Sequence, residues 1–325
     1  MAYDEIENLN DELEFESLED SVVDEIWSEV EIENPKWSAP LIFAKELWKP
    51  VMKAILNIFN QPSRKRADNL CVYGNTDTGK TTCFDKIIPS FQRMKKLHGY
   101  EIVQVTCFTN MTVAGFYKAI LDKINFNYRR SDNIADLERR LTNALVEKGV
   151  KILIFDEFSN ISFMNSQERN LFLKALRNIP THTKIPIIVI GTQRVLDLLS
   201  EDSETNNRYE KIEFPRFSLA NGKWKELQLI IATLDSYLLE TTKIVSDFST
   251  NGKLIEKLYL ESKGKMGSII KIYERVVHIT IEGGYKKLSE NLLDKAIAIL
   301  NKNNRLHDDE NGLLDMEFPN DWANS

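Results

Sequence analysis

The sequence predicts an α/β protein in which a parallel sheet is flanked by helices and followed by a small all-helical region. Three observations lead to this prediction. A glycine-containing loop joins an apolar strand to a helix, apolar strands then alternate with helical patterns, and helical periodicity alone continues over residues 223–305. Alternation of strands and helices is typical of parallel sheets covered on both faces.

The chain falls into five parts on composition and periodicity. Its two ends are acidic, and the regular patterns lie between them. The expected parts are an acidic N-terminal tail (1–34), a helical segment leading into the core (35–66), an α/β core (67–220), a helical lid subdomain (221–305) and an acidic C-terminal tail (306–325).

Within the core, four apolar runs predict strands and the segments between them predict helices. Two prolines mark expected breaks, because proline lacks the N–H that a helix interior needs. We expect Pro50 to interrupt the helical segment 35–66 and Pro89 to stop the helix that follows the glycine-containing loop. The expected strands are 69–74, 101–107, 151–155 and 185–190, and the expected helices lie near 113–125, 134–148 and 166–178.

The loop after the first strand has the pattern G-x-x-x-x-G-K-T of a phosphate-binding P-loop. Its glycines allow a tight turn, so that successive N–H groups and a helix N-terminus face the phosphates. The pattern predicts an ATP site in which Lys80 reaches the β- and γ-phosphates and the Thr81 hydroxyl binds Mg²⁺. The expected ATP-binding residues are Gly74, Asn75, Thr76, Asp77, Thr78, Gly79, Lys80, Thr81 and Thr82.

A second acidic element supports the nucleotide site. The apolar strand 151–155 is followed by Asp156 and Glu157, which is the Walker B pattern. The carboxyl ends of parallel strands lie at the sheet edge where ligands bind. We expect Asp156 to hold Mg²⁺ and Glu157 to act as the base that polarises the attacking water.

Other features limit the classes of protein. No apolar run reaches the roughly 18 residues of a membrane helix, and the acidic N-terminus does not resemble a signal peptide. Cys71, Cys83 and Cys107 show no metal-ligand spacing and are expected to be core residues of a cytoplasmic protein.

Charge is distributed unevenly along the chain. Residues 1–34 contain 14 acidic residues and residues 306–325 contain six, and neither segment contains lysine or arginine. Setting these twenty charges aside changes the net charge from −7 to +13 for residues 35–305. A basic body favours contact with nucleic acid, and the apolar residues scattered through the tails favour partner docking over simple solvation.

The motifs of this chain, in their order along the sequence, resemble those of the TniB/TnsC family, the AAA+ ATPases of bacterial DNA transposition modules. The resemblance extends over roughly residues 60–285. Its most specific elements are Tyr-Arg-Arg-Ser-Asp and the strand that ends in Gly-Thr. The matching stretches are 66–82, 116–121, 128–132, 154–160, 185–192, Arg208 with Tyr209, and the lid signature 264–270.

The resemblance implies roles for further residues. Thr192 is expected to be the sensor of the γ-phosphate, and Arg208 the arginine finger that completes a neighbouring subunit's site. Arg194 and Arg216 lie nearby and compete for the finger role. The lid departs from the common AAA+ pattern, because Gly267 and Ser268 stand where a sensor arginine is usual. Lys265 or Lys271 could substitute, and a slow switch is favoured over a fast motor.

Contacts to DNA are expected at two places. Thr109 and Asn110 follow the second strand and could line a central channel. The segment Tyr128-Arg129-Arg130 lies between helices that carry further basic residues, including Lys118. Contacts to phosphates need only positive or polar groups on one face, and they give affinity without sequence readout.

Together these features predict an ATP-dependent regulator of transposition. It would assemble as a ring or helical filament on double-stranded DNA, associate with the nucleoid, and recruit or activate a transposase. A target-selector protein or an RNA-guided complex would be a further partner. The acidic residues form no triad for two metals, so the chain is not expected to be the transposase itself. The alternatives are an AAA+ helicase loader or replication initiator, and a STAND-type signalling switch.

Overall fold

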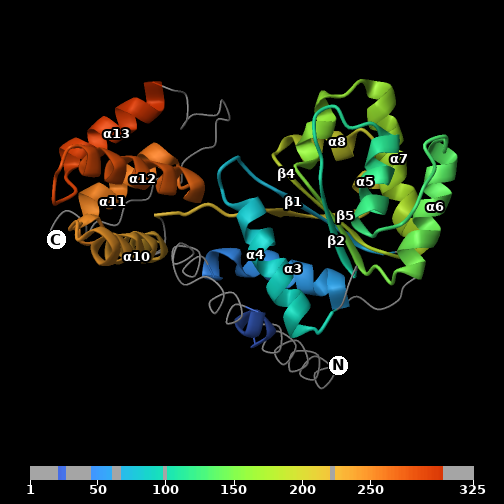
Figure 1. Ribbon diagram of the computed structural model, residues 1–325, viewed down its shortest axis with the longest axis horizontal. Helices are drawn as coiled ribbons and strands as arrows, with labels where there is room; N and C mark the ends of the chain where they lie inside the picture. The colour runs from blue at the N-terminus through green and yellow to red at the C-terminus, as the bar shows by residue number, and fades with distance from the viewer. Residues whose placement is uncertain (1–20, 27–44, 61–66, 98–100, 220–223, 303–325) are drawn as a thin grey trace, which may run out of the picture. The chain divides into compact units, whose positions relative to one another are not determined.

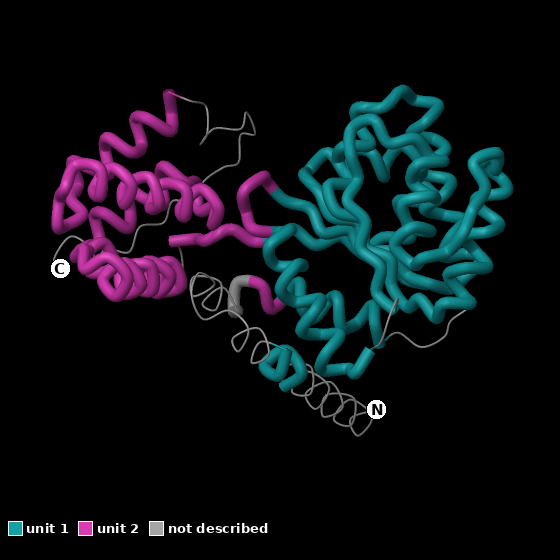
Figure 2. The backbone as a smooth tube through the Cα atoms, in the orientation of Figure 1, with its two compact units in different colours: residues 1–26, 50–74, 80–214 teal, residues 27–49, 75–79, 215–325 magenta. Residues whose placement is uncertain are grey.

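The computed structural model describes residues 21–26, 45–60, 67–97, 101–219 and 224–302 of the protein. The chain forms two compact units, which are coloured separately in Figure 2. Unit 1 comprises residues 1–26, 50–74 and 80–214, and unit 2 comprises residues 27–49, 75–79 and 215–325. The acidic tails lie outside the described residues, except for residues 21–26, which are helical.

Unit 1 is built on a sheet of five parallel strands in the order β2-β3-β4-β1-β5. The central strands are almost completely buried, since helices cover both faces of the sheet (Figure 1). The predicted parallel sheet is therefore confirmed. Its strands are β1 (Asn69–Tyr73), β2 (Ile102–Thr106), β3 (Ile152–Asp156), β4 (Ile187–Gly191) and β5 (Tyr209–Glu213).

The helices of unit 1 form a layer on each face of the sheet, and one of them, α3, begins with residues 45–49 of unit 2. In Figure 1, α3 and α4 lie on one side, and α5, α6 and α7 lie on the other. The helical elements are α3 (Lys45–Asn60), α4 (Lys80–Met94), α5 (Val113–Lys123), α6 (Ile134–Glu147), the short η1 (Phe158–Phe163), α7 (Ser166–Thr183), α8 (Arg194–Ser200) and α9 (Ser203–Asn206).

Aromatic side chains fill the core between the sheet and the layer of α5, α6 and α7. The ring of Phe116 lies 4.7 Å from that of Phe155 and 5.2 Å from that of Phe172, and all three are fully buried. The three cysteines are also buried and unbridged, as expected, and burial raises the pKa of Cys71 and of Cys107 to about 12. Cys71 and Cys107 pack in this core, whereas Cys83 is buried on α4.

Two expected helix breaks are wrong. Pro89 lies inside α4, which continues to Met94, and Pro50 lies inside α3. In α4 the proline is on the exposed side, where water can replace the lost hydrogen bond. Ile88 and Phe91 on either side of it are buried. The apolar packing of the helix therefore outweighs the proline.

Strand β5 was not expected from the sequence. It contains three charged residues, and only Tyr209 is buried. It pairs with β1 alone and forms one edge of the sheet. An edge strand needs no continuous apolar run, so the pattern that identifies buried strands is absent here.

Unit 2 is helical, as expected for the C-terminal region, and contains α10 (Trp224–Thr242), α11 (Gly252–Ser262), α12 (Met266–Glu282) and α13 (Glu290–Lys302). A short helix, η3 (Phe248–Thr250), follows α10, and the buried carboxylate of Asp235 joins α10, η3 and α12. It accepts hydrogen bonds from the Tyr273 hydroxyl at 2.7 Å and from the N–H of Ser249 at 2.9 Å. Among the described residues, no helix combines the length and the apolar composition needed to cross a bilayer.

Phe116→Ala is expected to lower the free energy of unfolding by about 3–5 kcal/mol, because it leaves a cavity among packed rings. Phe163→Ala is the matched control. Phe163 is 58% exposed, and its removal should change stability by less than about 1 kcal/mol. Urea-induced unfolding followed by circular dichroism measures both. Equal losses in the two variants would contradict this description of the core.

Candidate nucleotide-binding site

The P-loop connects β1 to α4, as the sequence predicts. Lys80 is the first residue of α4, and its Nζ donates a hydrogen bond to the carbonyl oxygen of Gly74 at 2.7 Å. Gly79 has φ +98°, which only glycine adopts readily, so the loop can turn directly into the helix. This geometry places an ammonium group and a helix N-terminus at the same point, an arrangement suited to binding phosphate.

The Walker B carboxylate lies at the carboxyl end of β3 and meets the start of α4. Asp156 is only 3% exposed. Its Oδ1 accepts a hydrogen bond from the N–H of Glu157 at 2.7 Å, and its carboxylate is also bonded to the Thr81 side chain. The structure thus brings together the two residues expected to hold Mg²⁺.

Burial and neighbouring charges raise the pKa of both Walker B carboxyl groups. For Asp156 the largest cause is burial, opposed by the Glu157 N–H, the Thr81 hydroxyl and the charge of Lys80. For Glu157, partial desolvation comes first and the charge of Asp156 second, while Lys80 lowers the pKa. A raised pKa makes Glu157 a better proton acceptor than an ordinary surface carboxylate.

Glu157 also has a backbone conformation that is uncommon for residues other than glycine. Its φ is 53° and its ψ is 32°, in the left-handed region. Such strain persists only where the surrounding structure enforces it, and it is concentrated at functional sites. This conformation sets the direction of the chain after Glu157, where η1 begins, and the Glu157 side chain is exposed.

The sequence did not identify Ser159, which connects the Walker B segment to the expected sensor. The Ser159 Oγ accepts a hydrogen bond from the Thr192 N–H at 2.6 Å and lies 3.1 Å from the Thr192 Oγ1. A Cβ on Gly191 would lie 2.4 Å from the same Oγ. Only glycine before Thr192 leaves room for this close approach. In the sequence, Ser159 could have been recognised only as a serine two residues after Glu157.

The residues of this cluster are chemically suited to a nucleotide phosphate with Mg²⁺. Lys80 supplies a positive charge, and Thr81 and Asp156 supply the oxygen ligands that Mg²⁺ prefers. Within the described ranges, no group of three or more His, Cys, Asp or Glu side chains could hold a metal. A metal ion here would therefore depend on Thr81, Asp156 and the phosphates themselves, as is usual for Mg²⁺.

Residues 75–79 of the P-loop belong to unit 2, where they contact the start of α12. The carbonyl oxygen of Asp77 accepts a hydrogen bond from the Gly267 N–H at 2.7 Å, and the Asp77 carboxylate pairs with Lys271. Of the two lysines expected to substitute for a lid arginine, Lys271 is thus directed to a P-loop side chain. Lys265 is buried.

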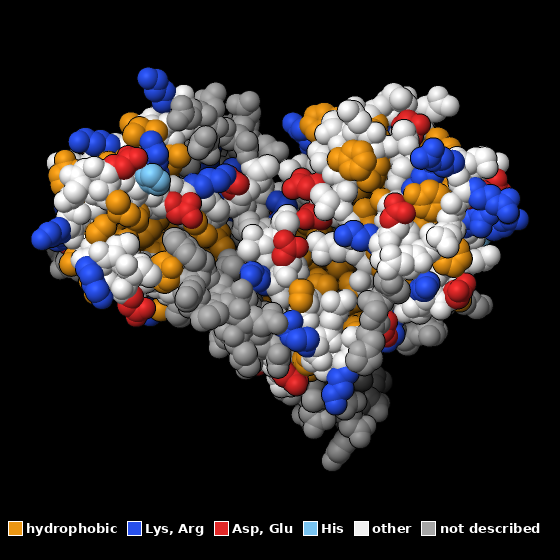
Figure 3. Space-filling model, in the orientation of Figure 1, with side chains coloured by type: hydrophobic (Ala, Val, Ile, Leu, Met, Phe, Trp, Pro, Cys, Tyr) orange, Lys and Arg blue, Asp and Glu red, His pale blue; other side chains and the backbone are white. Residues whose placement is uncertain are grey.

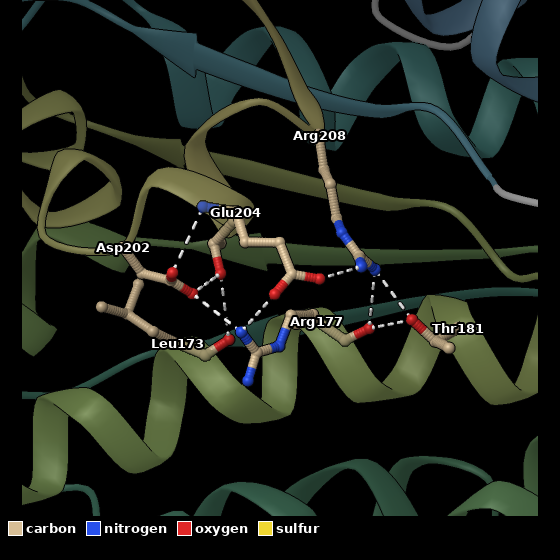
Figure 4. A network of polar contacts seen from close by, with 7 residues as sticks. Leu173, Arg177, Thr181, Asp202, Glu204 and Arg208 are labelled. Carbon is tan, nitrogen blue, oxygen red and sulfur yellow. Dashed lines mark hydrogen bonds and ion pairs between the residues drawn. The ribbon is translucent and has the colours of Figure 1, made fainter.

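Arg208, the expected arginine finger, is held inside its own unit (Figure 4). Its guanidinium donates to Glu204 at 2.8 Å, to the Thr181 hydroxyl at 2.7 Å and to the Arg177 carbonyl at 3.2 Å. The side chain is 10% exposed. Arg208 directly precedes β5, so it lies at the amino edge of the sheet, opposite Asp156. It cannot reach the phosphate site of its own chain.

The candidate DNA contacts fall into two separate groups. Thr109 and Asn110 are exposed in the turn before α5, whereas Arg129 and Arg130 are exposed in the turn after it. The helix between them has 11 residues, which corresponds to about 16 Å. Lys118 belongs with the second group, since its Nζ lies 5.6 Å from the centre of the Tyr128 ring. Figure 3 shows Lys and Arg side chains gathered beside α6.

The strand order, the P-loop between β1 and α4 and the carboxylates at the carboxyl end of β3 define the AAA+ class of P-loop proteins. Residues 40–219 match the family described as Bacterial TniB protein. The match covers more than half of the chain, and the chain therefore belongs to the TniB family. It ends before α10, so α10, α11, α12 and α13 lie outside the matched region.

Solved structures of several other proteins have a similar fold. The ORC2 protein of Aeropyrum pernix, in its ADPNP–ADP complexes, is 18% identical, with a TM-score of 0.55 over 81% of this chain and 68% of that one. Cdc6p of Pyrobaculum aerophilum is 13% identical, with a TM-score of 0.56 over 83% and 69%. The ORC1 protein of Aeropyrum pernix in complex with DNA is 15% identical, with a TM-score of 0.56 over 79% and 65%.

Asp156→Asn is expected to raise the melting temperature of the nucleotide-free protein by about 2 °C, because it removes a desolvated charge. The folded-state pKa of Asp156 is raised, so the penalty is present above that pKa and is relieved as the pH falls through it. The difference between variant and wild type should therefore shrink from neutral to acid pH. Glu210→Gln makes the same charge change at an exposed position of β5 and should leave the melting temperature unchanged. A lower melting temperature for Asp156→Asn would contradict the interpretation that the buried charge destabilises the nucleotide-free protein.

The Asp77–Lys271 pair is expected to couple weakly in a double-mutant cycle of Asp77→Asn, Lys271→Met and the double variant. The side chains are 33% and 44% exposed, so solvent limits the coupling to about 0.2–1 kcal/mol. Asparagine tolerates the φ of 61° at position 77, which keeps backbone strain out of the cycle. Chemical denaturation measures the free energies, and strictly additive effects would show that the pair does not form.

Proposed function

We propose that this chain is an ATP-dependent regulator of DNA transposition. It binds ATP, assembles on double-stranded DNA as a ring or filament, and recruits or activates a transposase. Hydrolysis then releases the assembly, so that DNA occupied by the protein is available to the transposase for a limited time. Target choice would come from a selector protein or an RNA-guided complex.

The observation that carries the proposal is the cluster at the carboxyl edge of the sheet. Lys80, Thr81 and Asp156 meet at one point, and Glu157 follows directly. P-loops occur in proteins of many functions, and membership of the TniB family favours a role in transposition among them.

Each residue of the cluster has a separate task in this proposal. Lys80 binds the phosphates, and Thr81 and Asp156 hold Mg²⁺, which neutralises charge that develops during phosphoryl transfer. Glu157 accepts a proton from the attacking water, a task that its raised pKa favours. Thr192 is bonded to Ser159 and senses whether the γ-phosphate is present.

The proposed partner is duplex DNA, bound through its phosphates. The exposed arginines after α5 and the polar turn before it offer positive charge and hydrogen-bond donors without readout of bases. A protein with a similar fold, the ORC1 protein of Aeropyrum pernix, was solved in complex with DNA. The net positive charge of residues 35–305 agrees with such a partner.

Completion of the site by a neighbouring subunit remains part of the proposal. For Arg208 to serve as the finger, its guanidinium would have to leave Glu204 and Thr181 when two copies meet. Arg194 and Arg216 remain the competing candidates. Arg194 is exposed and follows Thr192 by two residues, whereas Arg216 is half-buried. Replacing Arg208 removes structural contacts as well, so a loss of activity alone would not identify it as the finger.

A helicase loader or replication initiator is the second candidate. The likeness in fold to ORC and Cdc6 proteins favours it. Transposase-dependent integration and helicase loading, each assayed with purified components and ATP, would separate the two candidates.

Lys80→Ala is expected to abolish ATP-dependent oligomers on DNA, because the phosphates lose their positive partner. Lys86→Ala, on the same helix, is the matched control and should assemble normally. Sedimentation velocity of the full chain with a labelled duplex, with and without ATP, measures assembly. Unchanged sedimentation of the wild type on addition of ATP would refute the proposed function.

Glu157→Gln tests the proposed release step. It should lower hydrolysis on the order of 100-fold, since the general base is lost, while ATP binding is kept. Its oligomers on DNA should therefore persist after ATP is removed, whereas those of the wild type decay. Phosphate release and the lifetime of the oligomers are the two readouts, and rapid decay of the variant's oligomers would contradict release by hydrolysis.

A further inference from the structure

The exposed basic turn between α5 and α6 is held by hydrogen bonds and an ion pair. Asp132 closes it in two ways. Its Oδ2 accepts a hydrogen bond from the Arg129 N–H at 2.8 Å, and its own N–H donates to the Arg129 carbonyl at 3.1 Å. The same Oδ2 lies 2.7 Å from the Nε of Arg140 on α6. The turn is thus closed on itself and anchored to the following helix.

The residue that begins the turn is also fixed. The Tyr128 hydroxyl donates to Asp122 at 3.3 Å, and the ammonium group of Lys118 lies over the Tyr128 ring. Both partners are on α5, so the turn is attached to the helices on both sides. Arg129 and Arg130 are therefore exposed on a fixed backbone.

Asp132 carries a negative charge within this basic surface. The Arg129 N–H is the largest cause of a lowered pKa for Asp132, and the charges of Arg140 and Arg129 act in the same direction. The carboxylate is therefore ionised at neutral pH, and only 7% of its side chain is exposed. A negative charge repels a phosphate backbone and by itself weakens binding to DNA. Asp132 would therefore have to favour binding in another way to offset this repulsion.

We propose that Asp132 is a positioning residue for phosphate binding, which holds Arg129 and Arg130 so that they meet the DNA backbone together. The inference rests on the proposed function and extends it to one turn of the chain. Arg140 serves as the anchor of Asp132. Asp132 reduces the net positive charge of this surface. Because it also fixes the turn before DNA binds, Arg129 and Arg130 lose less conformational entropy on binding.

The two effects of Asp132 predict opposite results when it is replaced. If the residue acts only through its charge, Asp132→Ala removes repulsion and tightens binding to DNA. If it positions the turn, Asp132→Ala weakens binding by about 5- to 20-fold, the factor expected from freeing one backbone residue. Asp132→Asn keeps an oxygen that accepts the Arg129 N–H, so it should bind at least as tightly as the wild type.

The experiment measures the affinity of the full chain for a 30-base-pair fluorescein-labelled duplex by anisotropy, with ATP, at several salt concentrations. Asp136→Ala is the matched control, because Asp136 lies on the same surface and pairs with Arg139 at 3.4 Å. It should bind as tightly as the wild type or more tightly. Asp132→Glu keeps the charge but shifts the oxygens, and it should weaken binding as Asp132→Ala does.

Thermal melting followed by circular dichroism checks that each variant folds. If Asp132→Ala does not fold, the comparison of Asp132→Glu with Asp132→Asn decides the question. Binding by Asp132→Ala as tight as that of the wild type, or equal weakening by Ala and Asn, would overturn the inference and leave the proposed function standing. Absence of DNA binding by the wild type would overturn both.

Discussion

The buried carboxylate of Asp156 is the constraint on which the rest of the nucleotide site depends. It ends a strand without exposed side chains, and two donors stabilise its charge. The Thr81 hydroxyl ties it to the start of α4, and the N–H of the next residue, Glu157, donates a hydrogen bond to it. The following turn then places Ser159 against Thr192. Phosphate loop, proposed base and sensor are therefore positioned by one desolvated charge.

Sequence reasoning identified the parts of this site that are encoded locally. The P-loop and the Walker B residues follow from spacing along a single segment, and the central strands follow from apolar runs. Strand β5 was missed because an edge strand has charged residues and pairs on one side only. Pro89 was misread because its effect depends on which side of α4 it occupies. Ser159 was missed because its partner Thr192 lies 33 residues away.

Basic residues of this chain divide by what they contact, which composition alone does not reveal. Arg208 and Arg177 form ion pairs with Glu204 inside unit 1, and Arg140 pairs with Asp132. These arginines support the fold, and their charge is largely compensated. Arg129 and Arg130 are exposed on a turn that is closed by hydrogen bonds. A net charge therefore indicates the class of partner, whereas the pairing of individual side chains indicates where that partner binds.

Electron microscopy of the full chain with duplex DNA, in ATP or a slowly hydrolysed analogue and in ADP, tests the central claim most directly. The claim is that occupancy of the site at Lys80, Thr81 and Asp156 controls assembly on DNA. Ordered rings or filaments on DNA in ATP, and isolated particles in ADP, are the predicted result. The same particles on DNA in both nucleotides would contradict the account.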